Sequence, residues 1–196
     1  MKKAKHVFSS LPADYTLVQE LHLITDMKML KRLLVEDLAI SAAMFFGAFY
    51  SHPLRYLFKA GGGNVFVRLM AVLAVAAIYV FLHELMHAAV MKLFGAGHVK
   101  LQFTFGYAST CSTDYYDRLS YITVALAPVV ILGAALIIAS VYADREWFWV
   151  FYTSAILNFS GSCGDYEAIR FLSGMPKNML LSDNGISLSV YTPGDV

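Results

Sequence analysis

The chain has 196 residues, of which 58% are hydrophobic and 15% charged, and its mean hydropathy is +0.58. This composition is too apolar for a water-soluble domain, and the length is too short for several domains, so it predicts one integral membrane domain. The formal net charge of +1 provides no basic field for nucleic acid, and two cysteines without C-x-x-C spacing indicate neither a disulfide framework nor a thiolate zinc site.

Residues 1–32 are predicted to form a cytoplasmic amphipathic N-terminal segment. Between Tyr15 and Arg32, apolar residues recur at helical spacing, namely Leu17, Leu21, Ile24 and Met27. This pattern predicts a helix that lies on the membrane surface or packs on the rest of the domain. No apolar run follows the first lysines directly, so a cleavable signal peptide is not expected.

Four later segments are apolar enough to be predicted as transmembrane helices. They run over about residues 33–50, 69–94, 119–142 and 147–172, with Pro128 inside the third. After the second span, apolar and polar residues alternate from Val99 to Tyr107, which predicts a strand or hairpin that either caps the helices or pairs with an extended substrate. The stretch Ile186 to Tyr191 predicts a further strand outside the bilayer.

The predicted fold class is therefore an α-helical integral membrane protein with about four transmembrane helices. It includes a small β-like insert after the second helix and the amphipathic N-terminal helix. Residues 33–175 would form a membrane-embedded core, and residues 176–196 a cytoplasmic tail. Lysine and arginine are more numerous on the side that holds the N-terminus, so the positive-inside rule places both termini of this multi-pass protein in the cytoplasm, in the plasma membrane.

The second span contains an H-E-x-x-H motif formed by His83, Glu84 and His87. On a helix this spacing places both imidazoles on one face, one turn apart, where they can share a zinc ion, with Glu84 beside them as a general base. Ionisable residues in a spanning helix are costly and usually functional. The motif therefore predicts a Zn2+ site.

A catalytic zinc site uses three protein ligands, so a third ligand must come from another segment. Asp165 is the predicted ligand because it lies near the cytoplasmic end of the fourth span, at a depth similar to that of the histidines. Glu167 and Cys163 are the next candidates for the third ligand. Alternatively, Asp165 binds no metal and only marks the end of the span. Asn158 is a candidate catalytic residue that donates a hydrogen bond to the oxyanion or to substrate backbone, or else a packing amide between helices.

The H-E-x-x-H motif in one membrane helix and the Asn158 and Gly164-Asp165 element in a later one resemble the site-2 protease type of intramembrane metalloprotease. More closely, the chain resembles the small zincin membrane proteins of the DUF3267 family. The resemblance implies that His83, His87 and Asp165 hold zinc and that substrates are membrane-spanning proteins. Site-2 proteases usually have an Asn-x-x-Pro stretch that leads to Leu-Asp-Gly, whereas this chain has no proline three residues after Asn158, and its aspartate follows a glycine.

The predicted function is a zinc metalloprotease, an intramembrane endopeptidase that hydrolyses peptide bonds of membrane-protein substrates, with Glu84 activating a zinc-bound water. The alternative is a non-catalytic membrane scaffold or chaperone that retains a structural metal site. A transporter is less well supported because the chain lacks two repeat halves. The expected partners are a membrane-protein or peptide substrate and the lipid bilayer, without nucleic acid, and a homo-oligomer is left open.

Overall fold

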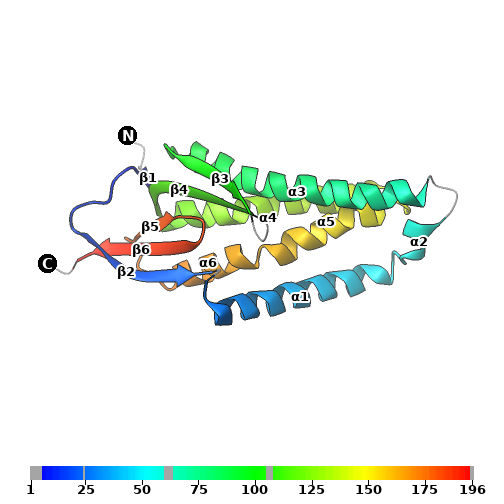
Figure 1. Ribbon diagram of the computed structural model, residues 1–196, viewed down its shortest axis with the longest axis horizontal. Helices are drawn as coiled ribbons and strands as arrows, with labels where there is room; N and C mark the ends of the chain where they lie inside the picture. The colour runs from blue at the N-terminus through cyan, green and yellow to red at the C-terminus, as the bar shows by residue number, and fades with distance from the viewer. Residues whose placement is uncertain (1–5, 24, 60–63, 105–107, 195–196) are drawn as a thin grey trace. The chain divides into compact units, whose positions relative to one another are not determined.

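The computed structural model describes residues 6–23, 25–59, 64–104 and 108–194 (Figure 1). The chain divides into two compact units. Unit 1 comprises Met1–Lys31, Glu84–Ala127 and Gly164–Val196, and unit 2 comprises Arg32–His83 and Pro128–Cys163. The boundaries at residues 83 and 127 fall inside continuous helices.

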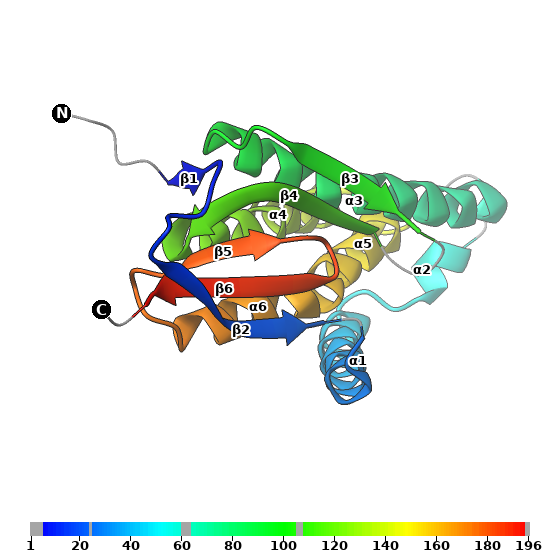
Figure 2. The same ribbon diagram turned by 60° about the vertical axis from the view of Figure 1, so that its left-hand side comes forward.

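Unit 1 contains an antiparallel six-stranded sheet in the order β1-β4-β5-β6-β2, with β3 also paired to β4. The strands are β1 (Val7–Phe8), β2 (Tyr15–His22), β3 (Val99–Phe103), β4 (Ala108–Asp117), β5 (Leu180–Asp183) and β6 (Ser187–Pro193). Figure 2 shows β4, β5, β6 and β2 side by side. The sheet therefore joins three distant parts of the sequence, and β2, from the N-terminal part of the chain, pairs with β6, the last strand.

The core of unit 1 lies between this sheet and three helical segments. Buried sheet residues such as Tyr116, Leu181 and Val190 belong to the same apolar cluster as helix residues, namely Met91, Val124, Ala168 and Leu172. These helix residues come from the end of α3 (Val65–Leu93), the start of α4 (Arg118–Tyr142) and α6 (Cys163–Ser173). Burial of apolar surface thus brings these three helix segments together on the sheet.

Helix α4 begins with a side-chain cap from Asp117. The Asp117 carboxylate accepts hydrogen bonds from the backbone N–H and the hydroxyl of Ser120, at 2.8 and 2.7 Å, and it pairs with His6. Burial works to raise the pKa of Asp117, but the Ser120 hydrogen bonds and the interaction with His6 outweigh it, so the pKa lies below its usual value. The charged carboxylate therefore stabilises the fold.

Substitution of Asp117 should reduce the stability of the fold. Asp117→Ala should lower the free energy of unfolding by about 1 kcal/mol at neutral pH, whereas Asp117→Asn, which keeps a capping oxygen, should lower it less. Because the folded-state pKa is depressed, the contribution is present above the usual carboxyl pKa and is lost as the pH falls through the folded-state value. Thermal unfolding of the purified protein measures this, and an alanine variant as stable as the wild type at pH 7 would contradict it.

Unit 2 is made of helices only among its described residues. These are most of α1 (Met27–Phe49), α2 (Arg55–Phe58), the first part of α3, the second part of α4, and α5 (Phe148–Gly161). An aromatic cluster at the start of α5 forms its core, in which Phe148 and Trp149 pack with Ala48 and Leu57. The Trp149 indole N–H donates a hydrogen bond to the His52 carbonyl at 2.9 Å, so this buried polar group is satisfied.

The prediction of an α-helical protein with four transmembrane helices is wrong. The fold includes a six-stranded sheet, and among the described residues only α3 and α4 are long and apolar enough to cross a membrane. In α1, five charged residues lie within the first eleven positions, which leaves an apolar stretch of roughly 18 Å. The predicted fourth span is broken at Ser162 into α5 and α6, and the 14 residues of α5 rise only about 21 Å.

The predicted amphipathic N-terminal helix is also wrong, because Tyr15–His22 is strand β2 and α1 begins only at Met27. The strand predicted after the second span is confirmed as β3 over Val99–Phe103, while residues 105–107 lie outside the described part of the chain. The strand predicted near the C-terminus is confirmed as β6. The fold is therefore mixed, with the N-terminal segment contributing sheet rather than helix.

Candidate metal centre

Helix α3 carries the H-E-x-x-H residues near its C-terminal end. The helix is continuous from Val65 to Leu93, so His83 and His87 lie one turn apart on one face, and Tyr79 lies one turn earlier on the same face. His87 and Glu84 are both buried, each with 8% of its surface exposed. The arrangement that the sequence spacing predicts for the two imidazoles is thus present.

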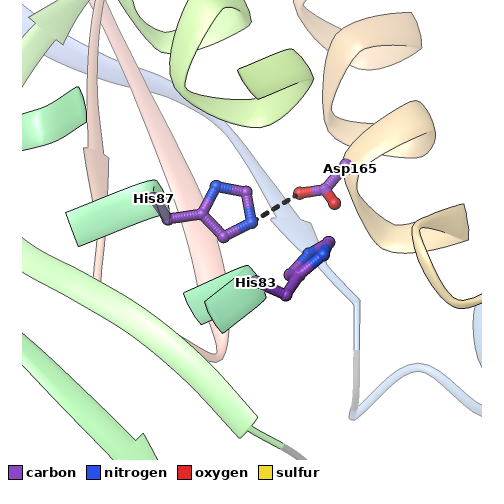
Figure 3. Close-up of side chains that lie close together, drawn as sticks. All are labelled: His83, His87 and Asp165. Carbon is purple, nitrogen blue, oxygen red and sulfur yellow. Dashed lines mark ion pairs between the residues drawn. The ribbon is translucent and has the colours of Figure 1, made fainter. Parts of the chain in front are cut away.

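Asp165 lies in the first turn of α6, just after the chain breaks from α5 at Ser162. A carboxylate is favoured at this end of a helix by the helix dipole. The Asp165 Oδ1 atom lies 3.5 Å from His87 Nε2, and the candidate ligand atoms of His83, His87 and Asp165 all lie within 4.8 Å of one another (Figure 3). The structure therefore brings the three predicted ligands together.

The second ring nitrogen of His87 is held by the backbone of α4. His87 Nδ1 lies 3.0 Å from the carbonyl oxygen of Val124. A carbonyl oxygen can only accept a hydrogen bond, so this contact requires the proton to be on Nδ1. In the neutral ring, Nε2 then carries the lone pair and is directed toward Asp165, as a metal ligand requires.

The ring of His83 is held in a similar way by Tyr79. The Tyr79 hydroxyl lies 3.1 Å from His83 Nδ1, and it donates to the carbonyl oxygen of Leu157 at 3.4 Å. Because the hydroxyl proton is directed to Leu157, the hydroxyl oxygen can accept a hydrogen bond from the Nδ1–H of His83. Both histidines therefore have an oxygen partner at Nδ1, which leaves Nε2 of each ring as the ligand atom.

Loss of the Tyr79 hydroxyl should weaken metal binding. We expect Tyr79→Phe to lower the zinc affinity of the purified protein by about tenfold, because the partner that orients a ligand histidine typically contributes that much. Tyr152→Phe is a matched control, since the Tyr152 hydroxyl donates to the Met44 carbonyl and contacts no candidate ligand in unit 2. Equal zinc dissociation constants for the two variants in a chelator competition would show that Tyr79 does not support His83.

The Glu84 side chain is held by Thr110 of β4. The buried Thr110 hydroxyl lies 2.8 Å from Glu84 Oε2 and 2.9 Å from the Glu84 carbonyl oxygen. A single hydroxyl proton is shared between these two acceptors, so Thr110 fixes one carboxylate oxygen of Glu84 against the helix. The other carboxylate oxygen can then accept a proton from a reacting group.

The pKa of a second buried carboxylate, Asp183 at the end of β5, is affected by the charges of His87 and Asp165. It accepts hydrogen bonds from the Tyr121 hydroxyl and the Gly185 backbone N–H. Burial raises the pKa of Asp183 to about 6, the negative charge of Asp165 adds to this rise, and the hydrogen bonds and the charge of His87 oppose it. A bound cation would favour the charged form of Asp183.

Asn158 is fully buried in α5, within unit 2. Its side-chain nitrogen donates to the Val129 carbonyl at 3.0 Å, and its Oδ1 has no hydrogen-bond partner among the described residues. A Cβ atom at Gly133 would come within 2.7 Å of that nitrogen, so the glycine allows this close approach. These contacts fit a packing amide, and the predicted catalytic role of Asn158 stays a prediction.

Glu167 and Cys163, the other candidates for the third ligand, do not belong to the group of described side chains able to hold a metal ion. Glu167 forms an ion pair with Arg170 on the same helix, and Cys163 is buried and forms no disulfide with another described residue. Among the residues that the structure describes, the group able to hold a metal ion includes Asp165 and neither of these two. Asp165 is thus the ligand that the geometry favours.

The residues present fit a zinc ion. Two imidazole nitrogens and one carboxylate oxygen are a common donor set for catalytic zinc, and they leave a fourth position for water or substrate. Ligand atoms around tetrahedral zinc lie about 3.3 Å apart. The observed group, within 4.8 Å, would therefore need only small side-chain rotations to close on the ion.

Comparison with known families gives one match. The model of the DUF3267 family, whose description is "Putative zincin peptidase", matches residues 76–180, more than half of the chain. The matched segment includes His83, Glu84, His87 and Asp165. Comparisons with curated proteins and with solved structures found no match.

Proposed function

We propose that this chain, which belongs to the DUF3267 family of zincin peptidases, is a zinc-dependent endopeptidase that cleaves membrane-protein substrates at the bilayer. The observation that carries the proposal is the convergence of His83 and His87 from α3 with Asp165 from α6, together with the buried Glu84, which follows His83 in the sequence. A purely structural metal site would need only the three ligands. The buried Glu84, which accepts a hydrogen bond from Thr110, also provides a general base, as a catalytic site requires.

Each residue of the metal centre would have a separate role in peptide hydrolysis. Zinc, when bound, supplies a Lewis acid that polarises the scissile carbonyl and makes water more acidic. His83, His87 and Asp165 would hold it, with the histidine rings fixed by Tyr79 and by the Val124 carbonyl. Glu84 would accept a proton from the attacking water at one carboxylate oxygen and deliver it to the leaving amine, while Thr110 holds the other oxygen.

The surface of α3 and α4 supports a location in the bilayer. Both helices are long and apolar enough to cross a membrane, and large apolar side chains on them are exposed, for example Phe66 and Leu73 on α3 and Val130 and Ile131 on α4. Such exposure is costly in water and favourable in lipid. We infer that this apolar surface contacts lipid in the plasma membrane.

The placement of the termini is part of the proposal. Strands β2 and β6 pair along their length, so the N-terminal and C-terminal parts of unit 1 must lie on the same side of any membrane. The lysines and arginines at the start of α1 favour the cytoplasmic side for this unit. We place both termini in the cytoplasm, where substrate segments leaving the bilayer would meet the metal centre.

Comparison of cleavage products in cells tests the proposal. The wild-type protein and Glu84→Gln are produced at equal levels in the same host, and new protein N-termini in the membrane fraction are quantified by mass spectrometry. We expect new termini within or beside membrane spans that appear with the wild type and are absent with the variant. Equal sets of termini in the two samples would overturn the endopeptidase and favour a scaffold that retains a metal.

A further inference from the structure

Helix α4 contains a proline, Pro128, in its interior. Proline has no backbone N–H, so it cannot donate the helical hydrogen bond to the carbonyl four residues earlier. In α4 that carbonyl belongs to Val124. Both residues are buried, with no more than 1% of the Val124 surface exposed, so water does not readily replace the missing donor.

The missing donor is supplied by the metal ligand His87. The Val124 carbonyl oxygen lies 3.0 Å from His87 Nδ1, and both residues belong to the buried part of unit 1. The ring N–H of a buried histidine needs an acceptor as much as the carbonyl needs a donor. The Val124 carbonyl, which lacks its helical donor, therefore accepts the hydrogen bond that the Nδ1–H of His87 needs to donate.

We propose that Pro128 is a positioning residue for the metal centre, because it keeps the Val124 carbonyl available to orient His87. The inference rests on the zinc site of the proposed function. Any other residue at position 128 would bring an N–H that competes for the same carbonyl and draws it back toward the helix axis. His87 would then lose the partner that fixes its tautomer and the direction of Nε2.

This role differs from that of a proline that only bends a helix. A bend alone would affect packing and stability, whichever atom the freed carbonyl contacts. The role proposed here predicts that adding an N–H at position 128 weakens metal binding even where the bulk of the side chain is kept. The effect of the added N–H on metal binding can be separated from the effect of lost side-chain volume on stability by changing the N–H and the volume independently.

The experiment compares three variants of the full-length protein in detergent. Pro128→Val adds an N–H and keeps most of the side-chain volume, and Pro128→Ala adds an N–H and removes volume. Val129→Ala is the matched control, since it removes volume from a neighbouring buried residue and adds no donor. The zinc dissociation constant is measured by competition with a fluorescent chelator, and the melting temperature is measured on metal-free protein.

We expect both Pro128 variants to bind zinc about 10- to 100-fold more weakly than the wild type, with metal-free melting temperatures at or above that of the wild type. Val129→Ala should melt at a lower temperature and bind zinc as the wild type does. Wild-type affinity in Pro128→Val and Pro128→Ala, or equal weakening in Val129→Ala, would overturn the inference. Failure of the wild type itself to bind zinc would instead overturn the proposed zinc site.

Discussion

Glu84→Gln is expected to lower the rate of peptide-bond cleavage by a factor of about 10³ or more, because a positioned general base contributes up to about 10⁴ to such a reaction. The amide can accept a hydrogen bond from Thr110 at its oxygen, as the carboxylate does, so packing around the buried side chain should be kept. It cannot accept a proton from water. The zinc content of the variant should therefore equal that of the wild type.

The matched control for this prediction is Glu167→Gln, which changes another buried glutamate of unit 1. Its carboxylate pairs with Arg170 and lies outside the group able to hold a metal ion. Cleavage is measured with a substrate identified from the membrane fraction, and zinc is measured in the same preparations. Cleavage at the wild-type rate by the zinc-loaded Glu84 variant would show that Glu84 is not the base.

Asp165→Ala is expected to reduce bound zinc from about one ion per chain to a small fraction of that amount. The substitution leaves two imidazoles, and a catalytic zinc site is built on three protein ligands. It also removes the carboxylate that lies 3.5 Å from His87 Nε2. Because Asp165 has part of its surface exposed and lies in the first turn of α6, the fold should survive its loss.

Two controls address the other residues that could take the third position. Glu167→Gln and Cys163→Ser should both retain zinc at the wild-type level, since neither residue belongs to the group of three. Metal content is measured by mass spectrometry on proteins purified without chelators. Zinc retained by Asp165→Ala and lost by one of the other variants would move the third ligand to that residue.

The grouping of His83, His87 and Asp165 could be predicted in part from the sequence, from the local spacing of the histidines and a similar depth for Asp165, although the four-span topology used to assign that depth is wrong. The spacing of His83 and His87 fixes their relation on any helix. Asp165 follows a stretch of small residues, and its predicted position relative to the histidines agrees with the observed group. The single span predicted over about residues 147–172 is broken at Ser162, and this break places Asp165 in the first turn of α6.

Strands β3 and β6 were predicted, but the whole sheet could not be, because its pairings are long-range and because β2 and β4 lack a clear apolar alternation. Strand β4 is rich in serine, threonine and tyrosine, which gave no strand pattern on its own. The apolar residues of β2 are spaced as in an amphipathic helix, yet this segment pairs with β6 at the other end of the sequence. Pairing with a distant strand overrode the local pattern.

The residues that support the ligands were missed for the same reason. Tyr79 lies one turn before His83, a spacing that can signal a contact on a helix, but its role depends on the Leu157 carbonyl of another helix. Thr110 reaches Glu84 only because β4 packs beside α3 in unit 1. Pro128 was visible in the sequence as a helix interruption, while the residue that uses the freed carbonyl was not.

X-ray absorption at the zinc edge of the purified wild-type protein shows whether His83, His87 and Asp165 hold the metal ion. We expect nitrogen and oxygen ligands only, at about 2.0 to 2.1 Å from zinc, with outer-shell scattering from two imidazole rings. A sulfur ligand at about 2.3 Å would place Cys111 or Cys163 at the metal and contradict the assigned centre. Protein that is folded, never exposed to chelator and free of zinc would contradict it as well.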